Sequence, residues 1–461
     1  MHAALSAAYD SSVPIYAVHA DNWRAVASDV APEAAEFVKA SGFEGEAGAH
    51  VLIPGLAAPV KAVLFGVEKP KATDRDPFLA GKLASVLPAG IYRLEGDFGD
   101  ATLAALAFVL GTYRYERYKA KPKGVTIKLV PPANVDANRV SLMAEAIAEG
   151  RDLINTPAND LGPQEIEFAI RSMADQFGAK IRSVIGDDLL TQNYPMVHAV
   201  GRASPRAPRI IDMVWGDEKH PKITLVGKGV AFDTGGLNIK PDNSMLLMKK
   251  DMGGAAVAIA AARMVMGFGL KIRLRLVVAA VENSISGSAF RPGDVLASRK
   301  GISVEIGNTD AEGRLILGDA LALADEESPD LILDFATLTG AARVALGPDL
   351  PPFYTDDDAL ADDIAHAGDR VNDPVWRMPL WKPYAKGLQS KIADINHITS
   401  GGFAGSVTAA LFLQRFVEKA KAWAHFDVFC WVPAAKNGRP EGGDPQAARL
   451  VFELLEKRYG R

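Results

Sequence analysis

Cysteine is almost absent from this chain: its 461 residues include one, Cys430. An intrachain disulfide needs two cysteines, so a disulfide framework is excluded, and a single cysteine fits a reducing compartment. The first residues, "MHAALSAAYDSSVPIY", lack a basic segment followed by a long apolar one, so we predict no secretory signal peptide. The most apolar windows, such as "LRLVVAAV", are too short to span a bilayer. These features predict a cytoplasmic protein without a membrane segment.

The sequence also lacks an excess of positive charge. Its 51 Lys and Arg against 56 Asp and Glu give a net charge of −5. This balance gives no electrostatic reason to expect binding to nucleic acid or to an anionic membrane. Hydrophobic residues make up 48% of the chain, and glycine and proline are not enriched, which is typical of a soluble globular protein.

The length is too great for one ordinary core, so two domains are expected. Residues 1–132 alternate short strand-like and helix-like segments and predict a smaller N-terminal α/β domain. Residues 133–158 contain a helical pattern that stops at "TPAND" and are interpreted as a connecting helix and linker. Residues 159–461 contain nearly continuous apolar strands, "KITLVG", "RLRLVVAAV", "GISVEIG", "LILDFATL" and "WAHFDVF". Such strands predict a larger α/β domain whose central, mostly parallel sheet is flanked by helices.

The segment "IGNTDAEGRLILGDAL" places three charged residues, Asp310, Glu312 and Arg314, where a strand-like run meets a helix-like run. Function in parallel sheets gathers at the carboxyl ends of strands. The two carboxylates could instead be favoured by the dipole of the following helix, and Arg314 could simply pair with Glu312. The segment alone does not decide between these interpretations.

A second segment, "LVGKGVAFDTGGLNIKPDNSMLLMKKDMGGAA", has four charged residues of interest in a glycine-rich loop after a strand: Lys228, Asp233, Lys240 and Asp251. A phosphate-binding loop is disfavoured, because no Gly-Lys pair is followed by Ser or Thr at the helix start and Phe232 replaces the third glycine of the dinucleotide fingerprint. Taken singly, Asp251 could be a helix N-cap and the lysines could be solvated surface residues.

The carboxylates favour a metal site. Four carboxylates at one sheet edge would repel one another unless multivalent cations compensate them. Oxygen ligands without nearby His or Cys suit hard or borderline divalent metals. Two metals about 3.5–4 Å apart need bridging carboxylates, which this set can supply.

Several segments resemble the signatures of the leucyl aminopeptidase family, the dimetal cytosol aminopeptidases of peptidase family M17: "VGKGVAFDTGGLNIKP", "MKKDMGGAA", "NTDAEGRL" and "ATLTGA". The resemblance covers essentially the whole second domain, whereas the first domain matches only in its alternating pattern and size. It implies a metalloaminopeptidase that removes N-terminal amino acids from peptides with a water activated by two metals. It also implies a homo-hexamer.

The resemblance implies a role for each charged residue of the two segments. One metal would be bound by Lys228 and Asp251, both metals would be bridged by Asp233 and Glu312, and Asp310 would complete the more exchangeable site. Lys240 and Arg314 would be catalytic groups, with a bicarbonate ion held at Arg314. Zinc or manganese is the expected metal. A lysine ligates only as the neutral amine, so the pKa of Lys228 is expected far below about 10.4.

The resemblance also implies a pocket for the first side chain of the substrate, lined by Met248, Thr337, Leu338, Gly340 and Phe429. Phe429 and Cys430 stand where family members often have a small Ala-Gly pair, so a bulky ring is expected to narrow or reshape the pocket. Phe429 could instead point into the core, because alternate strand residues face opposite sides. Two rival functions stay open: DNA binding, which the acidic balance disfavours, and a metal site without peptidase activity.

Overall fold

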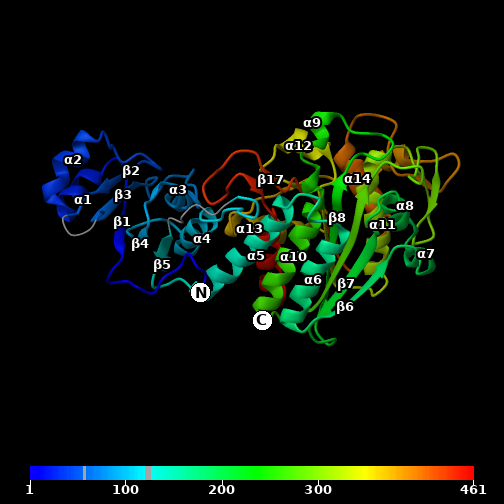
Figure 1. Cartoon of the computed structure of the whole chain (residues 1–461), viewed down its shortest axis with the longest axis horizontal. Coiled ribbons are helices and arrows are strands. Elements are labelled where there is room, and N and C mark those ends of the chain that lie inside the picture. The colour runs from blue at the N-terminus through cyan, green and yellow to red at the C-terminus, as the bar shows by residue number, and fades with distance from the viewer. Residues whose placement is uncertain (56–58, 120–125, 461) are drawn as a thin grey trace. The chain divides into compact units, whose positions relative to one another are not determined.

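The computed structural model describes residues 1–55, 59–119 and 126–460, and within them the chain forms two compact units. The first unit comprises residues 1–148 and 434–441, and the second comprises residues 149–433 and 442–461. Both are α/β, which confirms the predicted fold class (Figure 1). The return of residues 434–441 to the first unit was not expected from the sequence. The domain boundaries at 132 and 158 stay a prediction.

The first unit is built on a five-stranded sheet with the order β2-β3-β1-β4-β5. Strands β3, β1, β4 and β5 are parallel, and β2 pairs antiparallel with β3 at the edge. Its strands are β1 (Val13–Val18), β2 (His50–Ile53), β3 (Ala62–Gly66), β4 (Gly90–Glu95) and β5 (Ile127–Val130). Its helices are α1 (Trp23–Val30), α2 (Ala35–Ala40), α3 (Leu83–Val86) and α4 (Ala101–Gly111), and α5 (Ala137–Asn155) leads into the second unit.

The second unit is built on an eight-stranded sheet with the order β14-β13-β16-β12-β8-β9-β7-β6. The four central strands, β16, β12, β8 and β9, run parallel, and the antiparallel pairs lie outside them. The strands are β6 (Lys180–Ile185), β7 (Arg209–Trp215), β8 (Lys222–Asp233), β9 (Arg273–Asn283), β12 (Leu331–Ala336), β13 (Pro352–Tyr354), β14 (Trp376–Arg377) and β16 (Trp423–Asp427). Every residue of β12 and β16 is buried, as their continuous apolar pattern predicts.

Helices cover both faces of this sheet (Figure 1). On one face α10 (Gly253–Gly267) packs against α6 (Pro163–Phe177) and α15 (Ala448–Tyr459). On the other, α11 (Glu312–Asp325) packs against α8 (Pro195–Gly201) and α14 (Gly405–Gln414). The remaining helices are α7 (Asp188–Thr191), α9 (Asp242–Met245), α12 (Gly340–Leu346) and α13 (Asp358–Arg370). The glycines that start α10 allow close approach: a Cβ on Gly254 would lie 2.1 Å from the carbonyl oxygen of Phe335 in β12.

Two small sheets complete the second unit. One contains β10 (Val295–Ala297), β11 (Ser303–Glu305) and β15 (Ile395–Asn396), and the other pairs β17 (Trp431–Val432) with β18 (Gly442–Gly443). The apolar residues of "GISVEIG" predicted a strand of the central sheet. That prediction is wrong, because the segment supplies β11 of a small sheet. Only the middle residue of β11 is buried, so its pattern is that of a short strand with one covered face.

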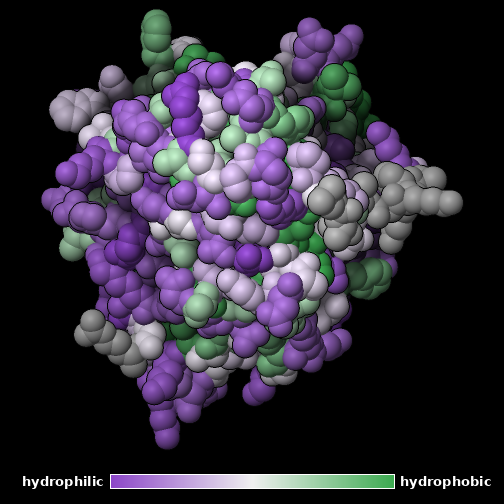
Figure 2. All heavy atoms as spheres, turned by 90° about the vertical axis from the view of Figure 1, so that its left-hand side faces the viewer, coloured by the Kyte–Doolittle hydropathy of each residue, from purple (hydrophilic) through white to green (hydrophobic). Residues whose placement is uncertain are grey.

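Hydrophilic residues dominate the face of the molecule seen in Figure 2, with hydrophobic residues scattered among them. Scattered apolar side chains are ordinary on a folded surface. Among the described residues, none of the helices combines the length and the apolar character that crossing a membrane requires.

Candidate functional site

Lys228 and Asp233 come from the same strand, and a β-bulge gives them a common face. Residues 228 and 233 are five positions apart, so a regular strand would point them to opposite sides. Lys228 pairs with Ala279 and Asp233 pairs with Asn283, so five steps on β8 match four on β9. The extra residue lies between Val230 and Asp233, where the register shifts. The bulge therefore brings both side chains to the face that α11 covers.

The amine of Lys228 is buried beneath the start of α11. Its Nζ lies 2.7 Å from Asp251 Oδ2 and 3.1 Å from Glu312 Oε1, and it donates to the carbonyl oxygen of Thr337 at 2.9 Å. Gly313 leaves room for it, because a Cβ there would lie 2.6 Å from Lys228 Cε and the lysine would have to shift. The "EGR" sequence thus lets the lysine reach between two carboxylates.

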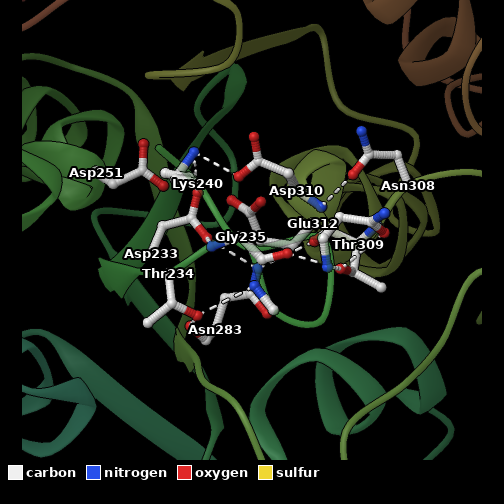
Figure 3. A network of polar contacts seen from close by, with 12 residues as sticks. Asp233, Thr234, Gly235, Lys240, Asp251, Asn283, Asn308, Thr309, Asp310 and Glu312 are labelled. Carbon is white, nitrogen blue, oxygen red and sulfur yellow. Dashed lines mark hydrogen bonds and ion pairs between the residues drawn. The ribbon is translucent and has the colours of Figure 1, made fainter. Parts of the chain in front are cut away.

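Lys240 joins two other carboxylates (Figure 3). Its Nζ lies 2.7 Å from Asp233 Oδ2 and 2.5 Å from Asp310 Oδ1. Asp233 is fixed on its other side, where Oδ1 accepts hydrogen bonds from the Gly235 N–H and from Asn283 Nδ2, both at 2.8 Å. One oxygen of Asp233 is therefore positioned by the strand ends, while the other faces the cluster.

Three carboxylates form a group that is compact enough to hold a cation. One oxygen from each of Asp233, Asp310 and Glu312 lies within 4.8 Å of the others. Asp251 stands beside this group and is linked to it through Lys228, which contacts both Asp251 and Glu312. Among the described side chains, Asp251 Oδ2, Asp310 Oδ1 and Glu312 Oε1 are buried oxygens that lack a hydrogen bond, although each lies close to a lysine amine. The donor set therefore fits divalent cations.

The pKa values reflect crowded like charges. Burial and the neighbouring Asp251 raise the pKa of Asp233 to about 6, and burial and Asp233 raise the pKa of Glu312 to about 8. Burial alone would lower the pKa of Lys228, but the charges of Asp251, Glu312 and Asp233 outweigh it and raise the pKa. The lowered pKa expected from the sequence describes a lysine beside two dications. Beside carboxylates the sign is the opposite, because the ammonium itself is the counter-charge.

Arg314 lies behind this cluster and does not line the cavity described below. The residue is 7% exposed, and its Nη1 donates to the carbonyl oxygen of His397 at 2.8 Å. Its Nε is buried without a hydrogen-bond partner among the described residues. Burial lowers the pKa of Arg314 to about 10, so the guanidinium stays charged at neutral pH. The ion pair with Glu312 considered from the sequence does not occur within the described part of the chain.

Asp251 does not cap α10. The N-cap of α10 is Met252, which has no side-chain cap, and the carboxylate of Asp251 accepts the hydroxyl of Thr337 at 2.9 Å. Asp310 lies in a short 3₁₀ turn, Thr309–Ala311, whose cap is Asn308. The capping explanation therefore fails for Asp251. Asp310 and Glu312 each lie in the first turn of a helix, so the helix dipole also favours them there, and the side chains of Asp251 and Asp310 point into the cluster.

A cavity of about 440 Å³ opens onto the cluster. It is lined by all five metal-ligand candidates and by Lys240, and by the five residues expected for the side-chain pocket, Met248, Thr337, Leu338, Gly340 and Phe429. Phe429 is half-buried and lines the cavity rather than the core. Its contribution to selectivity stays a prediction.

Four residues at the site were not predicted from the sequence: Asn283, Asp427, Lys250 and Arg343. Asn283 orients Asp233 and donates to the carbonyl oxygen of Thr309 at 3.0 Å. Asp427 fixes the loop after β12: its Oδ1 accepts the N–H groups of Leu338 and Thr339 at 3.1 Å, and its Oδ2 accepts the hydroxyl of Thr339 at 2.6 Å. Each of these two residues is the last residue of a strand of the central sheet, Asn283 of β9 and Asp427 of β16. Their position at a strand end is the signal that could have identified them. Lys250 and Arg343, which also line the cavity, carried no such signal.

Comparisons of the sequence with known proteins identify a family. The model of the cytosol aminopeptidase family, catalytic domain, matches residues 149–451, and that of the M17 aminopeptidase N-terminal domain matches residues 13–132. A probable cytosol aminopeptidase of Chlorobium limicola is 36% identical over 90% of each chain. One from Agrobacterium fabrum is 39% identical over 90% of this chain and 86% of the relative.

Solved structures give the same assignment. Cytosol aminopeptidase from Coxiella burnetii is 45% identical, covers 97% of both chains and has a TM-score of 0.92. The bottromycin maturation enzyme BotP in complex with Mn is 31% identical, covers 97% of this chain and 99% of its own, and has a TM-score of 0.85. The resemblance noted in the sequence is thereby confirmed, and the chain belongs to the cytosol aminopeptidase family as a leucyl aminopeptidase-type hydrolase.

Proposed function

We propose that this aminopeptidase releases N-terminal amino acids from peptides at two divalent cations held by Lys228, Asp233, Asp251, Asp310 and Glu312. The observation that carries the proposal is the group of three carboxylates within 4.8 Å, with buried oxygens that lack hydrogen bonds. Repulsion that raises the pKa of Asp233 and Glu312 is the environment that cations relieve.

The family resemblance gives the division of the ligands: Lys228 and Asp251 would hold one cation, Asp310 would complete the other site, and Asp233 and Glu312 would be shared. The contacts of Lys228 with Asp251 and Glu312, and of Lys240 with Asp233 and Asp310, support it. Lys228 ligates only as the neutral amine, so its ammonium proton has to leave when a cation binds. When bound, the two cations would lower the pKa of a water molecule and polarise the scissile carbonyl group. Zinc and manganese both suit this mixture of carboxylates and one nitrogen.

Lys240 is the proposed donor to the developing oxyanion. Burial alone would lower its pKa, but the charges of Asp233 and Glu312 raise it, so the side chain stays an ammonium. The side chain lines the cavity and is held by Asp233 and Asp310. A fixed ammonium stabilises negative charge that forms beside it without reorganising at the moment of reaction.

Arg314 is proposed to hold bicarbonate, which would carry the proton that the guanidinium itself is too weak a base to accept. The unpartnered Nε supports an anion there, because a guanidinium presents its N–H groups in a plane that matches a planar oxyanion. The hydrogen bond from Nη1 to His397 holds the remaining part of the group in place.

Zinc or manganese addition to chelated protein is the test of the proposal. Chelation should abolish the release of leucine from leucyl peptides, and Zn²⁺, Mn²⁺ or Co²⁺ should restore it at different rates. Full activity in protein that elemental analysis finds free of metal would reject the two-metal mechanism. Metal binding without peptidase activity would support the rival in which the site is not catalytic.

We further propose that the protein is a cytoplasmic homo-hexamer that does not bind DNA. The support is the family membership, the name cytosol aminopeptidase carried by the relatives, and the net charge of −5. Light scattering on the purified protein measures the subunit number, and a mobility shift that falls with salt would reveal DNA binding.

A further inference from the structure

Two cations lie close to the ring of Phe429, which lines the cavity. The Nζ of Lys250 lies 5.1 Å from the ring centroid, and the Cζ of Arg343 lies 4.8 Å from it. All three residues line the cavity that opens onto the carboxylate cluster. They come from three separate segments, so the fold rather than a local motif brings them together.

Neither cation has a carboxylate of its own. Within the described residues, Lys250 and Arg343 make no ion pair and no side-chain hydrogen bond, whereas Lys228 and Lys240 lie 2.5–3.1 Å from carboxylates. Lys250 is nevertheless only 4% exposed. A buried cation without a partner costs free energy, and a ring face offsets only part of that cost.

The carboxylates of the same cavity are already engaged. Asp251 lies 2.7 Å from Lys228 and accepts the hydroxyl of Thr337. Asp427 accepts hydrogen bonds from the loop after β12. An anion that balances the buried amine of Lys250 therefore has to come from the ligand that enters the cavity, and the solvent-exposed guanidinium of Arg343 lies beside the same ring to contact it.

We propose that Lys250 and Arg343 form a carboxylate subsite for the peptide substrate, with Phe429 as its apolar floor. This inference rests on the proposed peptidase function and adds a substrate class to it. A peptide carries carboxylates in two places, an acidic side chain at its first residue and its own C-terminus. The phenyl ring suits the aliphatic stem of a glutamate as well as the backbone of a dipeptide, and the two cations suit the carboxylate of either.

The experiment compares substrates that differ only in one carboxylate. The first arm measures kcat/KM for Glu- and Gln-p-nitroanilide, which lack a C-terminal carboxylate. The second arm measures it for Leu-Gly and its C-terminal amide, which lack an acidic side chain. Each arm uses the wild-type enzyme, Lys250→Met, Arg343→Met and the control Lys249→Met. Lys249 is the neighbouring lysine, but it donates to the carbonyl oxygen of Asn155 at 2.7 Å and does not line the cavity.

In one arm the wild-type enzyme should prefer the carboxylate form, and Lys250→Met or Arg343→Met should reduce that preference by about 10- to 100-fold, the range for a charged hydrogen bond. The arm that responds identifies the carboxylate. Lys249→Met should leave the preference unchanged. Equal preference ratios in wild type and both variants, with hydrolysis of Leu-p-nitroanilide and metal content intact, would overturn the subsite while leaving the peptidase function standing. Loss of Leu-p-nitroanilide hydrolysis in the metal-loaded wild type would instead reject the proposed function.

Discussion

The carboxylate cluster and the wall around Phe429 line one cavity, but their charges are balanced in different ways. In the cluster each lysine lies against two carboxylates, and the excess of carboxylates raises the pKa of Asp233 and Glu312. In the wall formed by Lys250, Arg343 and Phe429, two cations lie near a ring, and neither forms an ion pair with the described residues. The cluster is therefore proposed to take cations, whereas the wall is proposed to take an anion.

The comparison separates residues that act on the reaction itself from residues that determine which substrates are preferred. Changes in the cluster should alter metal content or rate for every substrate, because each substrate uses the same reacting centre. Changes in the wall should alter the order of substrates while metal content stays constant. The predictions below test that separation.

Glu312→Gln should have the largest effect. The substitution removes a buried charge that lies 3.1 Å from Lys228 and within the group of three carboxylates. Several kcal/mol of transition-state stabilisation are at stake, so kcat should fall by about 10³-fold or more and metal content should fall with it. Elemental analysis and steady-state kinetics measure the two quantities. A variant that keeps two metals and the wild-type rate would contradict the bridging role.

Lys240→Ala should lower the rate without emptying the metal site. Loss of one oxyanion donor typically costs about 10²–10³-fold in kcat. Metal content should stay at the wild-type level, because the ammonium is a counter-charge and not a ligand. Metal loss as large as that in Asp251→Ala would count against the assigned role of Lys240.

Gly313→Ala should disturb the cluster by displacing Lys228. The added methyl group would lie 2.6 Å from Lys228 Cε, and the lysine is enclosed by Asp251, Glu312 and Thr337. Displaced ligand partners typically cost about 10- to 100-fold in metal affinity, which metal titration of chelated protein would measure. Gly287→Ala is the matched control, since no atom lies within 4 Å of its added Cβ. Equal affinities in the two variants would show that Lys228 adapts.

How far the sequence could predict this site depends on how local each feature is. Segment 228–251 begins in β8 of the central sheet, so its place at a strand end could be expected. Segment 306–314 follows β11 of the small sheet, so the two segments meet although they do not share the single sheet edge that was predicted. The side of the sheet on which the Asp233 side chain lies could not be predicted, because it depends on a β-bulge that only the pairing of β8 with β9 reveals. The same holds for Arg343, whose position beside Phe429 requires the fold of two distant segments. The lowered pKa expected for Lys228 applies to the site with two cations bound and stays a prediction, whereas the surrounding carboxylates alone raise it.

Strand assignment shows the same limit in the rest of the fold. The apolar strands of the central sheet were recognisable because burial on both faces leaves a continuous pattern. "GISVEIG" was assigned to that sheet by the same criterion, although it supplies only the three-residue strand β11 of a small sheet. Three residues carry too little periodicity to show which sheet a strand joins.

Phe429→Ala should have the smallest effect and one confined to selection. The ring lines the cavity beside the expected site for the first side chain, so its removal should raise kcat/KM for bulky neutral first residues relative to small ones. A contact of this kind is worth about 1–3 kcal/mol, or about 10–200-fold, and the half-buried ring favours the lower end. A panel of aminoacyl anilides measures the order of substrates, and the melting temperature of the same variant measures its stability.

Phe426→Ala is the control that keeps this prediction falsifiable. Phe426 is fully buried in β16 and stacks on Phe335 with ring centroids 5.1 Å apart, so its removal should destabilise the fold by about 3–5 kcal/mol. The order of substrates should not change, because Phe426 does not line the cavity. Phe429→Ala should show the reverse combination, a small loss of stability with a changed order. A large loss of stability with an unchanged order would make Phe429 a packing residue like Phe426, and the wall would then owe its selectivity to the two cations alone.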